Sequence, residues 1–184
     1  MHLFGKQRWS KVASYEFFKK EFEFRGKHAR MADEMCFLND YEHTYFKRVV
    51  DLYVVAAVIG FRIDRKADVD YSPYESKSIF SEQMLKVKHD LDFIMQMIIM
   101  LEHAGKMPKE ECVKKAFRGV ETKEEFDYYQ NLFHSYVRGG VEELYERLIL
   151  HDTEGEEEFY DSKTAKLMAV LERFTPKGKI MDET

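Results

Sequence analysis

The seven histidines are the residues of this sequence best suited to bind a metal ion, but their spacing separates them. His89 and His103 belong to one predicted helix and would lie about 21 Å apart along its axis. No His/Glu pair on a predicted helix has the spacing of three or four residues that is typical of a helical metal site. Gly139 and Gly140 lack the lysine and the preceding strand of a phosphate-binding loop. We therefore expect no metal and no cofactor.

An acid–base site would have to be assembled from residues that are distant in the sequence. Helical bundles can hold such sites, or metal ions, in their interior. A helical enzyme of this kind is the alternative function, and its candidate residues are His89, Asp90, Glu102 and His134.

The two cysteines are candidates for nucleophiles, but each lies in an apolar stretch. Cys36 stands in Met35-Cys-Phe-Leu38, and Cys112 belongs to the inward stripe of its predicted helix. Such cysteines are usually small buried hydrophobic residues. Two cysteines in 184 residues also form no disulfide framework.

Two basic clusters could contact nucleic acid. The first contains Lys6, Arg8 and Lys11 beside Trp9, and the second contains Arg62, Arg65 and Lys66 in a polar connection. Arginine and lysine in such positions bind phosphates and place a protein without reading base sequence. The formal net charge of −5 argues against a dedicated nucleic-acid module, and solvated helix surfaces are the alternative explanation.

The composition predicts the architecture that would position these residues. The chain is 45% hydrophobic and 15% aromatic, with nine glycines and three prolines among its 184 residues. This favours one all-α domain over residues 1–175, a bundle of six or seven helices, with a frayed tail at 176–184. No apolar run reaches the length of a membrane span, and the start lacks the pattern of a signal peptide, so we expect a cytoplasmic protein.

Periodicity and helix-capping signals locate the helices. The clearest is a long central helix at about 79–104, whose apolar residues repeat with steps of three and four. A second helix, at 43–60, would stop at Gly60, and Gly139-Gly140 would separate two more. We expect residues 10–25 to be helical, because no second strand is evident to pair with them. The other expected segments are helices at about 108–118, 122–137, 141–150 and 162–174, and a polar connection at 62–77.

Two stretches resemble small helical accessory proteins of bacterial anti-phage defence islands, those associated with DNA phosphorothioation (Dnd) systems. They are Phe46-x6-Tyr53-Val-Val-Ala-Ala-Val-Ile-Gly60-Phe61 and Phe126-x6-Phe133-x2-Tyr136-x2-Gly139-Gly140-x3-Leu144. The resemblance covers residues 46–148 and implies no catalytic residue. It leads us to expect a non-enzymatic subunit of a multi-protein antiviral defence complex that acts on DNA. Its partner would be another protein or a second copy, without a membrane.

Overall fold

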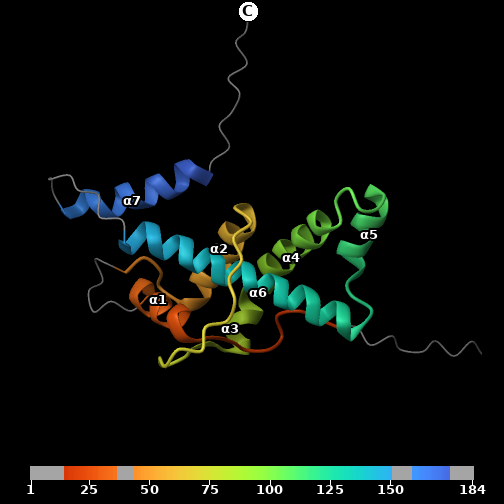
Figure 1. The fold of residues 1–184 in the computed structure, drawn as a ribbon, viewed down its shortest axis with the longest axis horizontal. Coiled ribbons are helices and arrows are strands. Elements are labelled where there is room, and N and C mark those ends of the chain that lie inside the picture. The colour runs from red at the N-terminus through yellow and green to blue at the C-terminus, as the bar shows by residue number, and fades with distance from the viewer. Residues whose placement is uncertain (1–14, 37–43, 151–158, 175–184) are drawn as a thin grey trace, which may run out of the picture.

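The structure, a computed structural model, describes residues 15–36, 44–150 and 159–174, and it confirms the all-α fold class (Figure 1). Within these ranges there are seven α-helices, a π-helical turn η1 and one pair of short strands. None of the described helices is long and apolar enough to cross a membrane. The bounds are β1 (Phe22–Phe24), α1 (Gly26–Cys36), α2 (Val49–Arg62), β2 (Lys77–Ile79), α3 (Ser81–Lys86), α4 (Lys88–Glu102), α5 (Lys109–Arg118), α6 (Lys123–Tyr145), η1 (Glu146–Leu150) and α7 (Phe159–Phe174).

The centre of the fold is the packing of α2 against α6. Gly60 and Gly140 lie at the contact, where the two backbones approach each other closely. A Cβ atom on Gly140 would stand 1.9 Å from the carbonyl oxygen of Ala56, and one on Gly60 would stand 2.0 Å from that of Tyr136. These glycines therefore allow two helices to touch and do not terminate them. The expected stops at Gly60 and at Gly139-Gly140 are wrong, and α6 continues through both glycines.

The expected helix at 79–104 is two helices. Val87 interrupts it with φ −109° and ψ 10°, so that α3 ends at Lys86 and α4 begins at Lys88. The apolar repeat is divided accordingly. Ile98 is buried in the core, whereas Phe80 is 61% and Leu101 is 54% exposed. The longest described helix is α6, and η1 extends it to Leu150.

Residues 22–24 form a strand, which corrects the helix expected at 10–25. β1 pairs antiparallel with β2, with Phe22 opposite Ile79 and Phe24 opposite Lys77. The partner strand lies at the end of the connection expected to be irregular, more than 50 positions away. Phe24 is 1% exposed and its ring lies against Tyr53 of α2, so this strand belongs to the core. Residues 10–14 and the tail at 176–184 lie outside the described residues.

The connection between α2 and β2 runs along α6 as an extended strap. The backbone N–H of Ala67 donates to the backbone carbonyl oxygen of Ser135 at 3.0 Å, and the Nε–H of Arg138 donates to the carbonyl oxygen of Ala67 at 2.7 Å. Residues 44–48 are not helical, so α2 begins at Val49 and not at the expected position 43. Tyr45 instead donates its hydroxyl to the carbonyl oxygen of Leu148, which ties this entry segment to η1.

Candidate functional site

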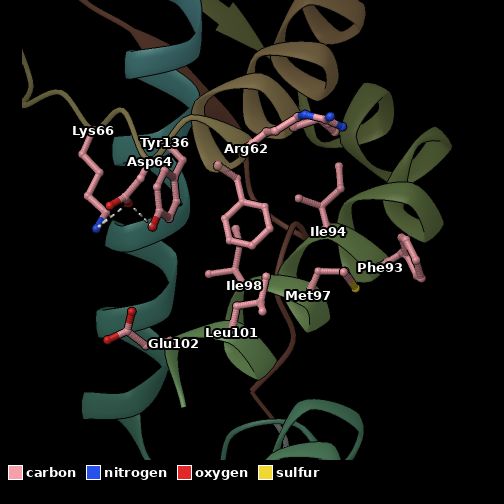
Figure 2. A pocket seen from close by; sticks show the side chains of 12 residues that line it. Arg62, Asp64, Lys66, Phe93, Ile94, Met97, Ile98, Leu101, Glu102 and Tyr136 are labelled. Atoms are coloured by element: carbon pink, nitrogen blue, oxygen red, sulfur yellow. Dashed lines mark hydrogen bonds and ion pairs between the residues drawn. The ribbon is translucent and has the colours of Figure 1, made fainter. Parts of the chain in front are cut away.

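An open groove of about 660 Å³ lies between α2 and α4 (Figure 2). Its floor is apolar and its rim is charged. The strap that follows α2 and the aromatic ring of Tyr136 on α6 close one side. The lining residues are Val58, Phe61, Arg62, Asp64, Lys66, Phe93, Ile94, Met97, Ile98, Leu101, Glu102 and Tyr136.

The apolar residues of the groove divide into a buried floor and an exposed edge. Ile94 and Ile98 are 8% and 1% exposed, while Phe93 is 59% and Leu101 is 54% exposed. Val58 faces them from α2 and is 44% exposed, although α2 is apolar almost all round. Exposed apolar side chains that gather around one groove mark an interaction site more often than a solvated surface.

Polar groups at one end of the groove hold each other in place. Tyr136 donates its hydroxyl to Oδ1 of Asp64 at 2.9 Å, and Nζ of Lys66 lies 3.2 Å from the same oxygen. The Lys66 ammonium also lies 4.9 Å from the centroid of the Tyr136 ring. The hydrogen bond from Tyr136, followed by that from Lys66, lowers the pKa of Asp64 and keeps it ionised. On the same side of the groove, Glu102 accepts hydrogen bonds from Lys106 and Tyr128, both at 3.1 Å.

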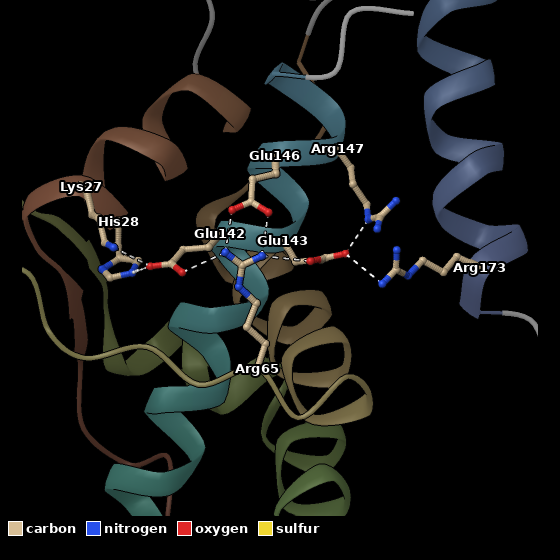
Figure 3. Close-up of polar contacts among 8 residues, drawn as sticks. All are labelled: Lys27, His28, Arg65, Glu142, Glu143, Glu146, Arg147 and Arg173. Carbon is tan, nitrogen blue, oxygen red and sulfur yellow. Dashed lines mark hydrogen bonds and ion pairs between the residues drawn. The ribbon is translucent and has the colours of Figure 1, made fainter.

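A second polar feature, the glutamate cluster, lies at the end of α6 and the start of η1 (Figure 3). It consists of Glu142, Glu143 and Glu146 around the guanidinium of Arg65. Arg65 binds Glu146 through two hydrogen bonds, of 2.7 and 2.6 Å, and reaches Glu143 at 3.0 Å and Glu142 at 3.2 Å. These carboxylates, Glu146 first, raise the pKa of Arg65 above its usual value. The arginine thus fastens the strap to α6.

Lysine, histidine and arginine side chains surround the outer carboxylates of the cluster. Glu142 binds Lys27 at 2.8 Å and the buried His28 at 3.0 Å, and Glu143 binds Arg147 at 2.5 Å. Burial raises the pKa of Glu142, but its hydrogen bonds outweigh that effect, and the net shift is downward. Each carboxylate is therefore ionised and paired, as buried charges must be.

The residues expected to contact phosphate are separated by this arrangement. Arg62 and Lys66 line the groove, whereas Arg65 points to the glutamate cluster and donates its hydrogen bonds to those carboxylates. Lys6, Arg8 and Lys11 lie outside the described residues. Nothing in the sequence joined Arg65 to α6, because its partners are 77 to 81 positions away.

The residues of the alternative, an enzyme site, do not converge. His89 is fully exposed at the start of α4, and Glu102 ends the same helix about 20 Å away. The ring of His134 lies 4.6 Å from that of Phe22, and burial, helped by the charge of Arg138, lowers its pKa to about 3. In the part of the chain that the structure describes, no three His, Cys, Asp or Glu residues gather as metal ligands.

The two cysteines are buried, as the sequence indicates. Burial raises the pKa of the Cys36 thiol to about 12, so it carries no thiolate at neutral pH. The Cys112 thiol donates to the carbonyl of His103 at 3.4 Å and packs between α4 and α5. Both behave as core residues.

Comparison with known proteins gives no relative: no protein family matches the chain, and no curated protein or solved structure shows significant similarity to it.

Proposed function

We propose that this protein is a non-catalytic subunit of a protein complex and that the groove between α2 and α4 receives a helix of its partner. The observation that carries the proposal is the edge of the groove. Phe93 and Leu101 are more than half exposed beside a buried apolar floor. Leaving such side chains in water is unfavourable by about 25 cal/mol per Å² of apolar surface, and a partner would remove that cost.

The spacing of the edge residues fits a helix as the occupant. Phe93, Met97 and Leu101 follow one another every four residues and form a row about 12 Å long on α4. Val58 and Phe61 form the opposite row on α2. Two such rows leave a channel into which the side chains of a third helix can fit, in the manner of helix-in-groove recognition.

The shape of the groove favours a protein over a small molecule. Pockets for small ligands enclose most of the ligand surface. Here the groove is open, Phe93 and Leu101 are exposed at its edge, and charged residues line its rim. An apolar centre with a polar rim is the usual anatomy of a protein–protein interface.

The wider role, as part of an antiviral defence complex that acts on DNA, rests on the sequence resemblance. Arg62 and Lys66 are at the groove rim, and with Lys6, Arg8 and Lys11 they stay the predicted contacts to DNA phosphates. Arg65 serves the fold and would have to break its bonds to three glutamates to join them. Because the chain is acidic overall, DNA binding would depend on positive surface from the partner.

Co-purification from the native host tests the proposal. The variant with Phe93→Glu and Leu101→Glu places two charges in the groove. Phe117→Glu is the matched control, because Phe117 is 64% exposed on α5, outside the groove. All three proteins should fold alike, by circular dichroism, since only exposed side chains change. The wild type and the control should retain the same identified partner, and the groove variant should lose it. Retention by the groove variant, or no partner with any of them, would overturn the proposal.

A further inference from the structure

Helix α7 faces the rest of the molecule with its polar side. Among the side chains described in this helix, only Val170 is buried, at 8% exposed. Beside it, Lys166 donates to the carbonyl oxygen of Leu148 at 3.4 Å, and Arg173 lies 3.8 Å from Glu143. These contacts hold α7 against η1 and the end of α6 through one apolar side chain and two cations.

The apolar side of α7 faces solvent. Leu167, Met168 and Leu171 are 37%, 50% and 59% exposed. At 100° per residue they fall within one 100° sector of the helix, and Val170 lies outside it. An amphipathic helix normally turns this sector inward. An outward apolar sector is what a helix that enters another molecule's groove requires.

The same chain therefore carries an open apolar groove between α2 and α4 and a helix, α7, with an exposed apolar side. The groove row from Phe93 to Leu101 is about 12 Å long, and the 16 residues of α7 span about 24 Å. The rim of the groove carries both signs of charge, with Arg62 and Lys66 beside Asp64 and Glu102, and the exposed Glu172 borders the apolar sector of α7. The helix is long enough to cover the row, and the two surfaces are both apolar.

The position of α7 directs it to a second molecule. It is held at η1, beyond the C-terminal end of α6, whereas the groove lies beside Tyr136 near the middle of that helix. In Figure 1, α7 lies above the C-terminal half of α6 and α4 lies above its N-terminal half. A helix of a second copy is therefore the better candidate for the groove than this chain's own α7.

We infer that the occupant of the groove is α7 of a second copy, so that two copies exchange their α7 helices. This inference rests on the proposed docking role of the groove and names the partner. The exchange is reciprocal: each copy offers one helix and one groove, and the assembly closes at two. The docked Leu167, Met168 and Leu171 would cover Phe93 and Leu101, and each side would lose its exposed apolar surface.

Light scattering coupled to size-exclusion chromatography measures the assembly with the full chain. The wild type should have twice the mass of one chain. Leu171→Glu, in the helix, and the double variant Phe93→Glu/Leu101→Glu, in the groove, should each be monomeric. Ala169→Glu and Phe117→Glu are the controls, because both change exposed residues outside the two surfaces, and both should stay dimeric.

Mixing the two monomeric variants gives the sharper test. The groove variant still has an intact α7, and Leu171→Glu still has an intact groove, so the mixture contains one complete helix–groove pair. A dimer of one copy of each should appear in the mixture and in neither protein alone. Variants with one added cysteine test whether α7 and the groove are in contact. Leu171→Cys mixed with Phe93→Cys should form a disulfide between chains, and Leu171→Cys mixed with Phe117→Cys should not.

A wild type that is monomeric at all concentrations would overturn the exchange, as would a dimer that both variants leave intact. A disulfide within one chain carrying both Leu171→Cys and Phe93→Cys, with the mass of a monomer, would show that α7 occupies its own groove, and this too would overturn it. The docking role is tested separately. If the protein is monomeric and its groove variant still loses a different protein partner, the exchange fails and the proposed function stands.

Discussion

The guanidinium of Arg65 binds the carboxylate of Glu146 through two parallel hydrogen bonds, although the two residues are 81 positions apart in the sequence. This paired geometry is the strongest that an arginine and a carboxylate form. It joins the strap after α2 to the end of α6, and so it fixes Asp64 and Lys66 at the rim of the groove. The glutamate cluster is therefore a structural support for the proposed docking site.

Removing the arginine should destabilise the protein. In Arg65→Met, Glu142 and Glu143 stay largely buried but lose a cation, and the free energy of unfolding should fall by about 3 kcal/mol. Urea denaturation followed by circular dichroism measures it. Arg118→Met, at an exposed position of α5, is the control and should change the stability by less than about 0.5 kcal/mol. Equal stabilities of the two variants would show that the cluster does not hold the strap.

A methyl group at the contact of α2 and α6 should also be costly. The Cβ of Gly140→Ala would lie 1.9 Å from the backbone oxygen of Ala56, and only a displacement of one helix can relieve the overlap. We expect a loss of about 2 kcal/mol, even though alanine favours helix by about 1 kcal/mol. Asn131→Ala, on the exposed side of α6, should leave the stability unchanged or raise it slightly. A Gly140→Ala protein as stable as the wild type would contradict this close packing.

Stability should fall with acidification because of His134. The pKa of the folded protein's His134 is about 3, below the value near 6.5 of an unfolded chain. Between these values the unfolded chain binds a proton that the folded one does not, so lowering the pH favours unfolding by about 1.4 kcal/mol per pH unit. Above pH 6.5 His134 is neutral in both states and the stability has its full value. As the pH falls from 6.5 towards 3, protonation of the unfolded chain lowers the stability.

The variant His134→Phe keeps an aromatic ring against Phe22 and removes the titrating group. Urea denaturation between pH 7 and pH 5 should therefore show a shallower decline in stability for this variant than for the wild type. His89→Gln changes a fully exposed ring and should keep the wild-type slope. Identical slopes for all three proteins would mean that His134 has the same pKa in the folded and unfolded states, which would contradict this prediction.

Local sequence signals predicted the helical class well and the helix ends less well. Thr122 does cap α6, and its hydroxyl accepts a hydrogen bond from the N–H of Glu125, as the spacing of these residues indicates. Gly60 and Gly140 carry the same local signal as a helix stop, but they serve a contact between helices that are distant in the sequence. A pattern read along one segment cannot distinguish the two roles.

Long-range pairing explains the remaining differences. β1 is a strand because β2 lies beside it, and no pattern in the residues near β1 predicted that pairing. The sequence marks Phe93 and Leu101 as members of an apolar stretch of helix, but whether that surface is covered depends on which helices pack against α4 in the fold. Likewise, the basic character of Arg65 is visible in the sequence, whereas its three glutamates become neighbours only in the fold.

Photo-crosslinking at Phe93 tests most directly whether the groove is a docking site. The photoreactive amino acid p-benzoylphenylalanine would replace Phe93 in the groove, or Phe117 outside it, in the full chain inside the native host. The two positions are similarly exposed, at 59% and 64%, so accessibility alone cannot separate them. The account predicts a covalent adduct with one defined protein, a second copy of this chain if α7 is exchanged, from position 93 and not from position 117. No adduct at position 93, or the same set of adducts at both positions, would contradict it.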